Sequence, residues 1–203
     1  MRASNTFESR SNFAAQHLIA AEYFRDQVVS IELENIPSSV QFSPPQYLHY
    51  WFASVIFAAM AMEANAYDLM TTVNRNEESP AQGRRFRAED LRKPLLDRYN
   101  LLHQIAMNGK ELPRGHGISQ DARALVLLRD EIVHYKTEWR SVATISKKLE
   151  ALLRARIKLN PYKCGNIFFP EQCVSASSSI WAINTSRSFM ESFSVTTKYR
   201  RNV

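Results

Sequence analysis

Arg129, Asp130 and His134 are three closely spaced side chains whose chemistry suits cleavage of a phosphodiester without a metal. Histidine, with an unperturbed pKa of about 6.5, can move protons near neutral pH. Arginine carries a permanent charge on a planar fork of donors, so it can hold the developing charge of a phosphorane. Asp130 precedes His134 by one helical turn, so we expect its carboxylate to orient or charge the imidazole. These residue types fit RNA transesterification by a ribose 2′-hydroxyl.

The three residues lie on a stretch whose apolar side chains recur at helical spacing. One side is a core-facing stripe, made of Leu125, Leu128, Ile132, Tyr135 and Trp139. A second side mixes small, apolar and ionic residues within an arc of about 140°. Its members are Ser119, Ala122, Arg123, Val126, Arg129, Asp130, Val133, His134 and Thr137. A half-apolar, half-ionic second side predicts contact with another subunit or a substrate.

Arg129 and His134 are separated by about 140° around a helix, so one copy does not easily aim both at one phosphate. Two copies packed across a two-fold axis can do so, because a seam on Val126 and Val133 brings each Arg toward the partner's His. We therefore expect a homodimer formed through a helix over 119–137.

A second predicted helix, 46–73, has a broad apolar face with Glu63 near its middle. An ionised carboxylate among apolar side chains needs a partner, and a basic residue on a neighbouring helix is the natural candidate. Arg129 is such a residue, either instead of or in addition to a catalytic role. A lone histidine on a helix is also more often structural than catalytic.

The run Leu-Leu-Arg-Asp-x-Ile-Val-His-Tyr around Arg129 and His134 resembles the signature of the HEPN superfamily. The run Ser-Val-Ile-Phe-Ala-Ala-Met-Ala-Met-Glu before Ala64 resembles the first core helix of the same proteins. The resemblance implies a small all-α domain, with RNA as substrate and a composite active site where two such helices meet. It implies Arg129 and His134 as catalytic residues, supported by Asp130 and Glu63. It also implies a toxin or defence role, with an antitoxin protein as a partner of a toxin.

Further basic residues are candidates for RNA binding: Arg84, Arg85 and Arg87, which surround Phe86, and Arg123 on the second side. Three arginines around an aromatic ring could hold phosphates and stack a base. The alternative, favoured by the general behaviour of charge runs, is a solvated loop.

The composition is that of a soluble globular protein, with 45% hydrophobic and 23% charged residues among 203. A net charge of +6 is compatible with a polyanionic partner. Cys164 and Cys173 predict neither a disulfide framework nor a zinc site, and we expect no metal or other cofactor. The polar first twelve residues and the short apolar run 50–62 predict no signal peptide and no membrane span, hence a cytoplasmic protein.

Five glycines and few turn dipeptides favour long helices. We predict an all-α, antiparallel, HEPN-like bundle of five to six helices, over 7–34, 46–73, 88–108, 119–137, 142–158 and 173–196. An N-terminal helix and Pro-rich link (1–45) would pack on a helical domain (46–196), followed by a basic tail (197–203).

Three hypotheses of function follow. The first is a HEPN-like, metal-independent endoribonuclease, acting as a toxin or defence component. The second is a catalytically inactive HEPN-like module that binds RNA, a nucleotide or a partner protein through the same face. The third is a helical scaffold without a nucleic-acid role.

Overall fold

The computed structural model describes residues 12–34, 43–75, 85–113, 115, 117–134, 147–162 and 165–197. These residues contain helices and no strands, which confirms the all-α class. The elements are α1 (Phe13–Glu34), α2 (Pro45–Arg75), α3 (Ala88–Leu91), α4 (Leu95–Ala106), α5 (Gly117–Val133), the π-helical turn η1 (Phe168–Gln172) and α7 (Ala176–Thr197). Residues 147–153 are also helical.

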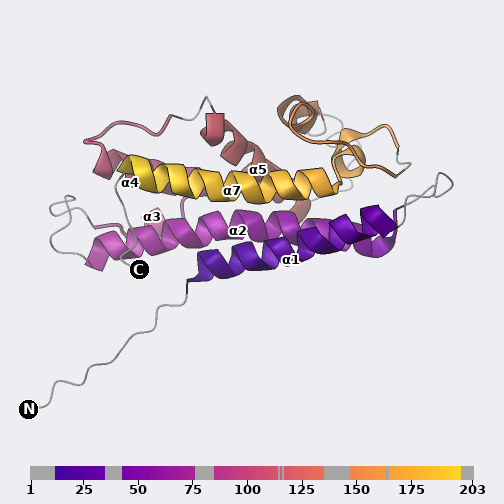
Figure 1. Ribbon diagram of the computed structural model, residues 1–203. Coiled ribbons are helices and arrows are strands. Elements are labelled where there is room, and N and C mark those ends of the chain that lie inside the picture. Colours follow the sequence, from indigo (N-terminus) through magenta and orange to yellow (C-terminus); the bar gives the residue numbers. More distant parts are fainter. Residues whose placement is uncertain are drawn as a thin grey trace, which may run out of the picture.

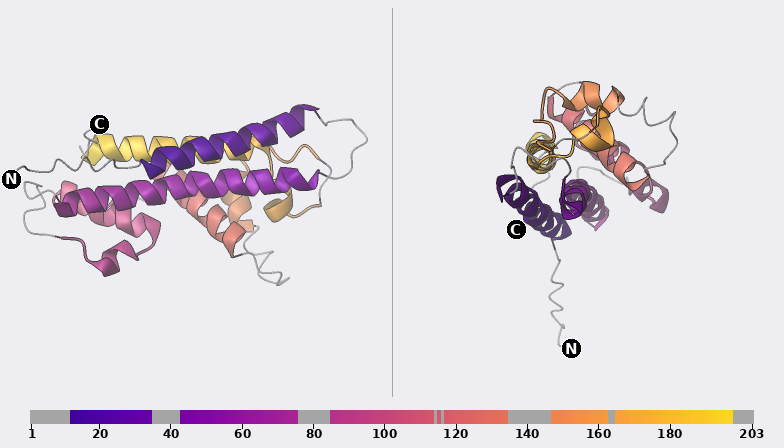
Figure 2. Two further views of the ribbon diagram at one scale, coloured as in Figure 1. Left: turned by 90° about the horizontal axis from the view of Figure 1, so that it is seen from below. Right: turned by 90° about the vertical axis from the view of Figure 1, so that its right-hand side faces the viewer.

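Three long helices, α1, α2 and α7, lie side by side and form the body of the molecule (Figure 1). The chain direction of α1 is opposite to that of α2 and α7, which run parallel to one another. The bundle is therefore only partly antiparallel. Helix α5 packs against α2 and α7 on the side away from α1 (Figure 2).

Helix α1 uses a narrow seam of small residues to approach its neighbours. Its buried residues, Ala14, Ala21 and Val28, are spaced seven apart, so they fall on one line along the helix. The small side chain of Ala21 allows close approach, and the Ser54 hydroxyl of α2 donates to its carbonyl oxygen at 3.1 Å. The predicted packing of the first helix on the bundle therefore has a defined contact.

The polar atoms of two buried aromatic side chains, on α2 and α4, form hydrogen bonds. The Trp51 indole donates to the Ser178 hydroxyl of α7 at 2.6 Å. The Tyr99 hydroxyl of α4 donates to the Met62 carbonyl at 3.0 Å, and its ring packs edge-on against Phe189. Such partners allow Trp and Tyr to be fully buried without leaving a polar atom unpaired.

The Glu32 carboxylate joins the ends of three helices. It accepts hydrogen bonds from the Tyr47 hydroxyl at 2.5 Å and from the Ala176 backbone N–H, at the start of α7, at 2.6 Å. The Tyr162 hydroxyl donates to the carbonyl of neighbouring Ile31 at 3.0 Å. Burial, together with the nearby Glu32 charge, raises the pKa of Tyr162. Glu32 therefore fixes the end of α1 against the beginnings of α2 and α7.

The prediction of a single helix over 88–108 is wrong. The chain forms α3, then a break at Pro94, then α4. Pro94, with φ −50° and ψ 147°, directly precedes α4. Proline cannot donate a backbone hydrogen bond in a helix interior, and it disfavours helical backbone in the residue before it, so one helix cannot run through this position. The predicted end of this segment is confirmed, since Asn108 and Gly109 both have positive φ.

Other helix boundaries differ by a few residues from those predicted. Helix α1 begins at Phe13, where the Asn12 side chain accepts from the Ala15 N–H at 3.1 Å. Helix α5 begins at Gly117, two residues before Ser119. The helix expected to reach residue 158 ends at 153, and the one expected from 173 begins at Ala176, after η1. The predictions for 7–11, 135–137, 142–146 and the tail beyond 197 lie outside the described residues.

Within the described ranges, no helix is long and apolar enough to cross a membrane.

Candidate functional site

The C-terminal end of α5 presents the predicted site residues at the surface. Leu125 and Leu128 are fully buried, as the core stripe predicted, whereas His134 is exposed and Val133 is 52% exposed. The inner side of α5 is therefore buried in the core, and its C-terminal end is exposed to solvent. Tyr135 and Trp139, the remaining stripe residues, lie outside the described residues.

The second side of α5 is only partly a free surface. Ala122 is fully buried, so this part of the side packs into the molecule's own core and cannot meet another subunit. Arg123 is exposed, and Val126 is partly buried against the core. The free part of this side is therefore concentrated toward Val133 and His134.

Two carboxylates hold the Arg129 guanidinium. Its Nη2 donates to Oε1 of Glu63 on α2, and its Nη1 lies 3.0 Å from Oδ1 of Asp130. The predicted basic partner of Glu63 is therefore Arg129. Glu63 is not surrounded by apolar groups as expected, because its side chain is 35% exposed, compared with 21% for Arg129.

Asp130 does not hold the imidazole of His134 in the manner predicted from their spacing. Its carboxylate contacts Arg129, and the bond to His134 runs between backbones, from the His134 N–H to the Asp130 carbonyl at 2.9 Å. No hydrogen bond joins the His134 imidazole to another residue in the described part of the chain. The carboxylate is drawn toward the guanidinium because that partner is permanently charged and offers several donors.

Glu131 and Lys148 extend the ionic group and were not among the predicted site residues. Burial and the neighbouring Asp130 charge raise the pKa of Glu131, while Lys148 and His134 act in the opposite direction. The Glu131 carboxylate therefore lies within electrostatic reach of His134. The three-residue spacing between Glu131 and His134, which places them on neighbouring turns, was the signal in the sequence.

Base stacking by Phe86, the less favoured of the two interpretations of this segment, does not fit its position. Its side chain is only 7% exposed, and its backbone N–H and carbonyl are both bound by the Asn74 side chain, at 2.7 and 3.0 Å. Arg85 and Arg87 are exposed, and Arg87 lies 3.5 Å from Glu89. Arg84 lies outside the described residues.

Arg85 and Arg87 are not brought next to Arg129. They flank Phe86, which is bound to Asn74 of α2, eleven residues beyond Glu63, or about 17 Å along the helix axis. Arg123, in contrast, is on α5 itself. Among the RNA-binding candidates in the described residues, Arg123 alone therefore shares a helix with Arg129.

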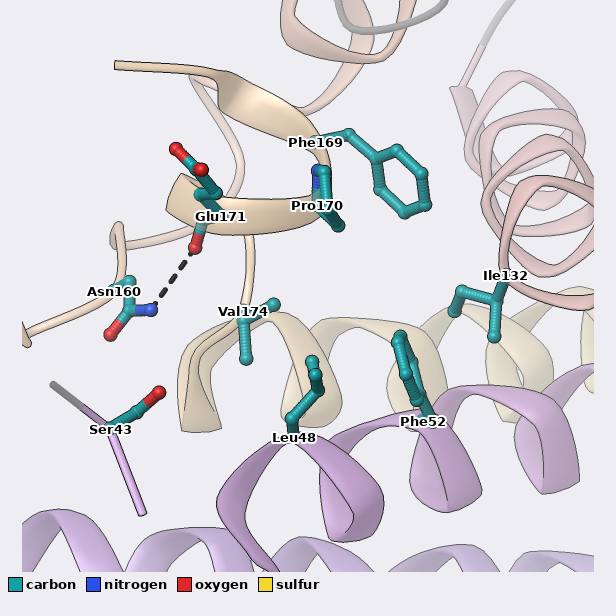
Figure 3. A pocket seen from close by; sticks show the side chains of 9 residues that line it. All are labelled: Ser43, Leu48, Phe52, Ile132, Asn160, Phe169, Pro170, Glu171 and Val174. Carbon is teal, nitrogen blue, oxygen red and sulfur yellow. Dashed lines mark hydrogen bonds between the residues drawn. The ribbon is translucent and has the colours of Figure 1, made fainter. Parts of the chain in front are cut away.

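A cleft of about 540 Å³ opens between α2, η1 and the C-terminal part of α5 (Figure 3). Most of its lining is apolar. The lining residues are Ser43, Leu48, Phe52, Ile132, Asn160, Phe169, Pro170, Glu171 and Val174. Ile132 lies between Arg129 and His134 in the sequence, so one wall of the cleft belongs to the helix that carries the ionic group.

No cluster of three or more His, Cys, Asp or Glu side chains in the described residues could hold a metal ion. Cys173 is a buried free thiol, and Cys164 is outside the described residues.

Comparison of the chain with protein-family models, curated proteins and solved structures finds no match. Function is therefore inferred from the residues and contacts of the site.

Proposed function

We propose that this chain is a HEPN-like, metal-independent endoribonuclease, with an active site made by Arg129 of one protomer and His134 of its partner. The arrangement of Arg129 carries the proposal. Its guanidinium is fixed by Glu63 and Asp130 at the surface end of α5, close in sequence to an exposed imidazole. A cation positioned before the substrate arrives stabilises developing charge without reorganisation during the reaction. A toxin or defence role follows from the resemblance alone.

The homodimer is supported by the end of α5. Val133 is 52% exposed next to His134, and the exposed part of Val126, which is partly buried against the core, lies two helical turns earlier on the same side. Packing these residues across a two-fold axis would cover apolar surface and bring each His134 toward the Arg129 of the other copy. A single copy separates the two side chains by about 140° around the helix.

In the proposed reaction His134 accepts the proton of a ribose 2′-hydroxyl, and the 2′-oxygen attacks the adjacent phosphorus. The bond from phosphorus to the 5′-oxygen breaks, that oxygen takes up a proton from water, and the protonated His134 returns its proton to water. The products are a 2′,3′-cyclic phosphate and a 5′-hydroxyl. Arg129 has five N–H donors, so donors remain for the phosphate when Glu63 and Asp130 are bound.

The test is incubation of purified protein with RNA in excess EDTA, with analysis of the product ends. We expect cleavage that ends in cyclic phosphate and is lost in His134→Ala and Arg129→Ala. His49→Ala and Arg92→Ala are matched controls, because both residues are exposed and distant in sequence from α5. Loss of cleavage in EDTA, or full cleavage by His134→Ala, would contradict the proposal.

A second candidate is a catalytically inactive module that binds RNA, a nucleotide or a partner protein. The two carboxylates favour it, since Glu63, Asp130 and Arg129 together carry a net negative charge that a phosphate must overcome. Salt-dependent RNA binding without product would support this candidate. Neither binding nor cleavage would leave a helical scaffold.

A further inference from the structure

The cleft beside α5 has aromatic and aliphatic walls from separate elements. Phe52 and Leu48 rise from α2, while Phe169 and Pro170 come from η1 on the other side (Figure 3). Its volume of about 540 Å³ lies within the range of small-ligand sites, about 300–1,000 Å³. The aromatic side chains offer surfaces against which a flat ring can pack.

The cleft selects against an anionic occupant. Glu171 is the lining residue with an ionisable side chain, and its carboxylate turns toward the Ile167 N–H, which donates to it at 3.3 Å. The carboxylate also lies so close to Gly165 that a side chain there would collide with it. The described lining residues include no Lys, Arg or His that could pair with a phosphate inside, so burying an unpaired phosphate there would be costly.

Polar groups gather at one end of the cleft, opposite the rings of Phe52 and Phe169 (Figure 3). The Asn160 amide donates to the Glu171 carbonyl at 3.1 Å, and its oxygen accepts from the Tyr162 N–H at 3.0 Å. An amide nitrogen has two hydrogens and an amide oxygen two lone pairs, so Asn160 retains hydrogen-bonding capacity. A flat, uncharged ring with a hydrogen-bonding edge fits this lining better than an aliphatic chain.

Ile132 places one wall of the cleft on the same helix as Arg129. It lies three residues after Arg129, about 5 Å along the helix, and two before His134. We propose that the cleft binds one unpaired nucleobase of an RNA strand whose phosphate contacts Arg129. The rings hold the base by stacking, and Asn160 and Ser43 read its edge. This assignment rests on the proposed function for the identity of the strand.

The test measures binding separately from cleavage. Short single-stranded 2′-O-methyl RNA has no free 2′-hydroxyl to attack, and an abasic oligomer of equal length carries the same phosphates without bases. We expect the intact chain to bind the base-bearing oligomer about tenfold more tightly, within the range for loss of one stacked base. Phe52→Leu, which removes the ring and keeps an apolar side chain, should abolish this difference.

Tyr67→Leu is the matched control, because Tyr67 is a 53% exposed aromatic residue of α2 outside the cleft. Leu48→Trp, which fills the cleft, provides a second test should Phe52→Leu fail to fold by circular dichroism. Equal binding of both oligomers by the intact chain would overturn the assignment. Binding restricted to free mononucleotides would also overturn it. Base-dependent binding that persists in His134→Ala, with cleavage absent in every form, would retain the base site and reject the nuclease.

Discussion

Glu63→Gln should lower the free energy of unfolding by about 1 kcal/mol, because it removes a partly exposed ion pair with Arg129. Fully exposed pairs contribute up to about 1 kcal/mol, and breaking a buried pair costs about 3–5 kcal/mol. The exposed fractions here, 35% for Glu63 and 21% for Arg129, place this pair between those limits. Asp130, 3.0 Å from the same guanidinium, keeps Arg129 paired in the variant and holds the cost near the lower limit.

Arg129→Gln should cost more, about 2 kcal/mol, because it removes both ion pairs and leaves two carboxylates without their shared cation. The double variant then isolates the Glu63–Arg129 coupling, which we expect to be about 1 kcal/mol in favour of the pair.

Urea unfolding at low salt measures the four forms, and thermal unfolding checks them, with a shift of about 2–4 °C for each kcal/mol in a chain of this size. The coupling should decrease in about 1 M salt without reaching zero, because a partly buried pair is screened less than an exposed one. A coupling smaller than about 0.3 kcal/mol at low salt would refute the claim that Glu63 positions the guanidinium.

Three further changes test other parts of the structure. Ala21→Leu should destabilise the chain by about 1–3 kcal/mol by overpacking the α1 seam, as measured by urea unfolding. Glu32→Ala should cost about 2 kcal/mol, because Tyr47 and the first N–H of α7 lose their acceptor, and the midpoint of thermal unfolding would report it. Glu131→Gln should stabilise the chain at pH 7: the raised pKa of Glu131 means that its charged form is disfavoured on folding, and the gain should vanish below its ordinary pKa of 4.5, where both side chains are neutral. An equal gain at pH 3 and pH 7 would contradict that cause.

Much of the helical architecture is visible in the sequence because burial follows helical periodicity. Leu125 and Leu128 were placed on the core side of their helix by spacing alone, and both are fully buried. Pro94 was missed because the flanking leucines continue the same periodicity across it, although proline excludes an unbroken helix there. The break between α3 and α4 therefore follows from the backbone restrictions of proline, which apolar periodicity does not reveal.

The site was harder to anticipate because it depends on tertiary contacts. A counter-ion for Glu63 was foreseen, but the four-residue spacing of Asp130 and His134 did not reveal that the Asp130 carboxylate contacts Arg129 and not the imidazole. The position of Phe86 between arginines suggested base stacking, and only its backbone contacts with Asn74 show why it is buried. The cleft combines residues from three distant segments, so no local pattern could reveal it.

Complementation between two inactive variants tests the composite active site most directly. His134→Ala and Arg129→Ala protomers, each inactive alone, should form mixed dimers that contain one intact pair, with Arg129 from the first protomer and His134 from the second. Random pairing should restore RNA cleavage to about a quarter of the level of the unmodified protein. Mixed dimers without cleavage, or a chain that remains monomeric at the concentrations at which it cleaves RNA, would contradict the account.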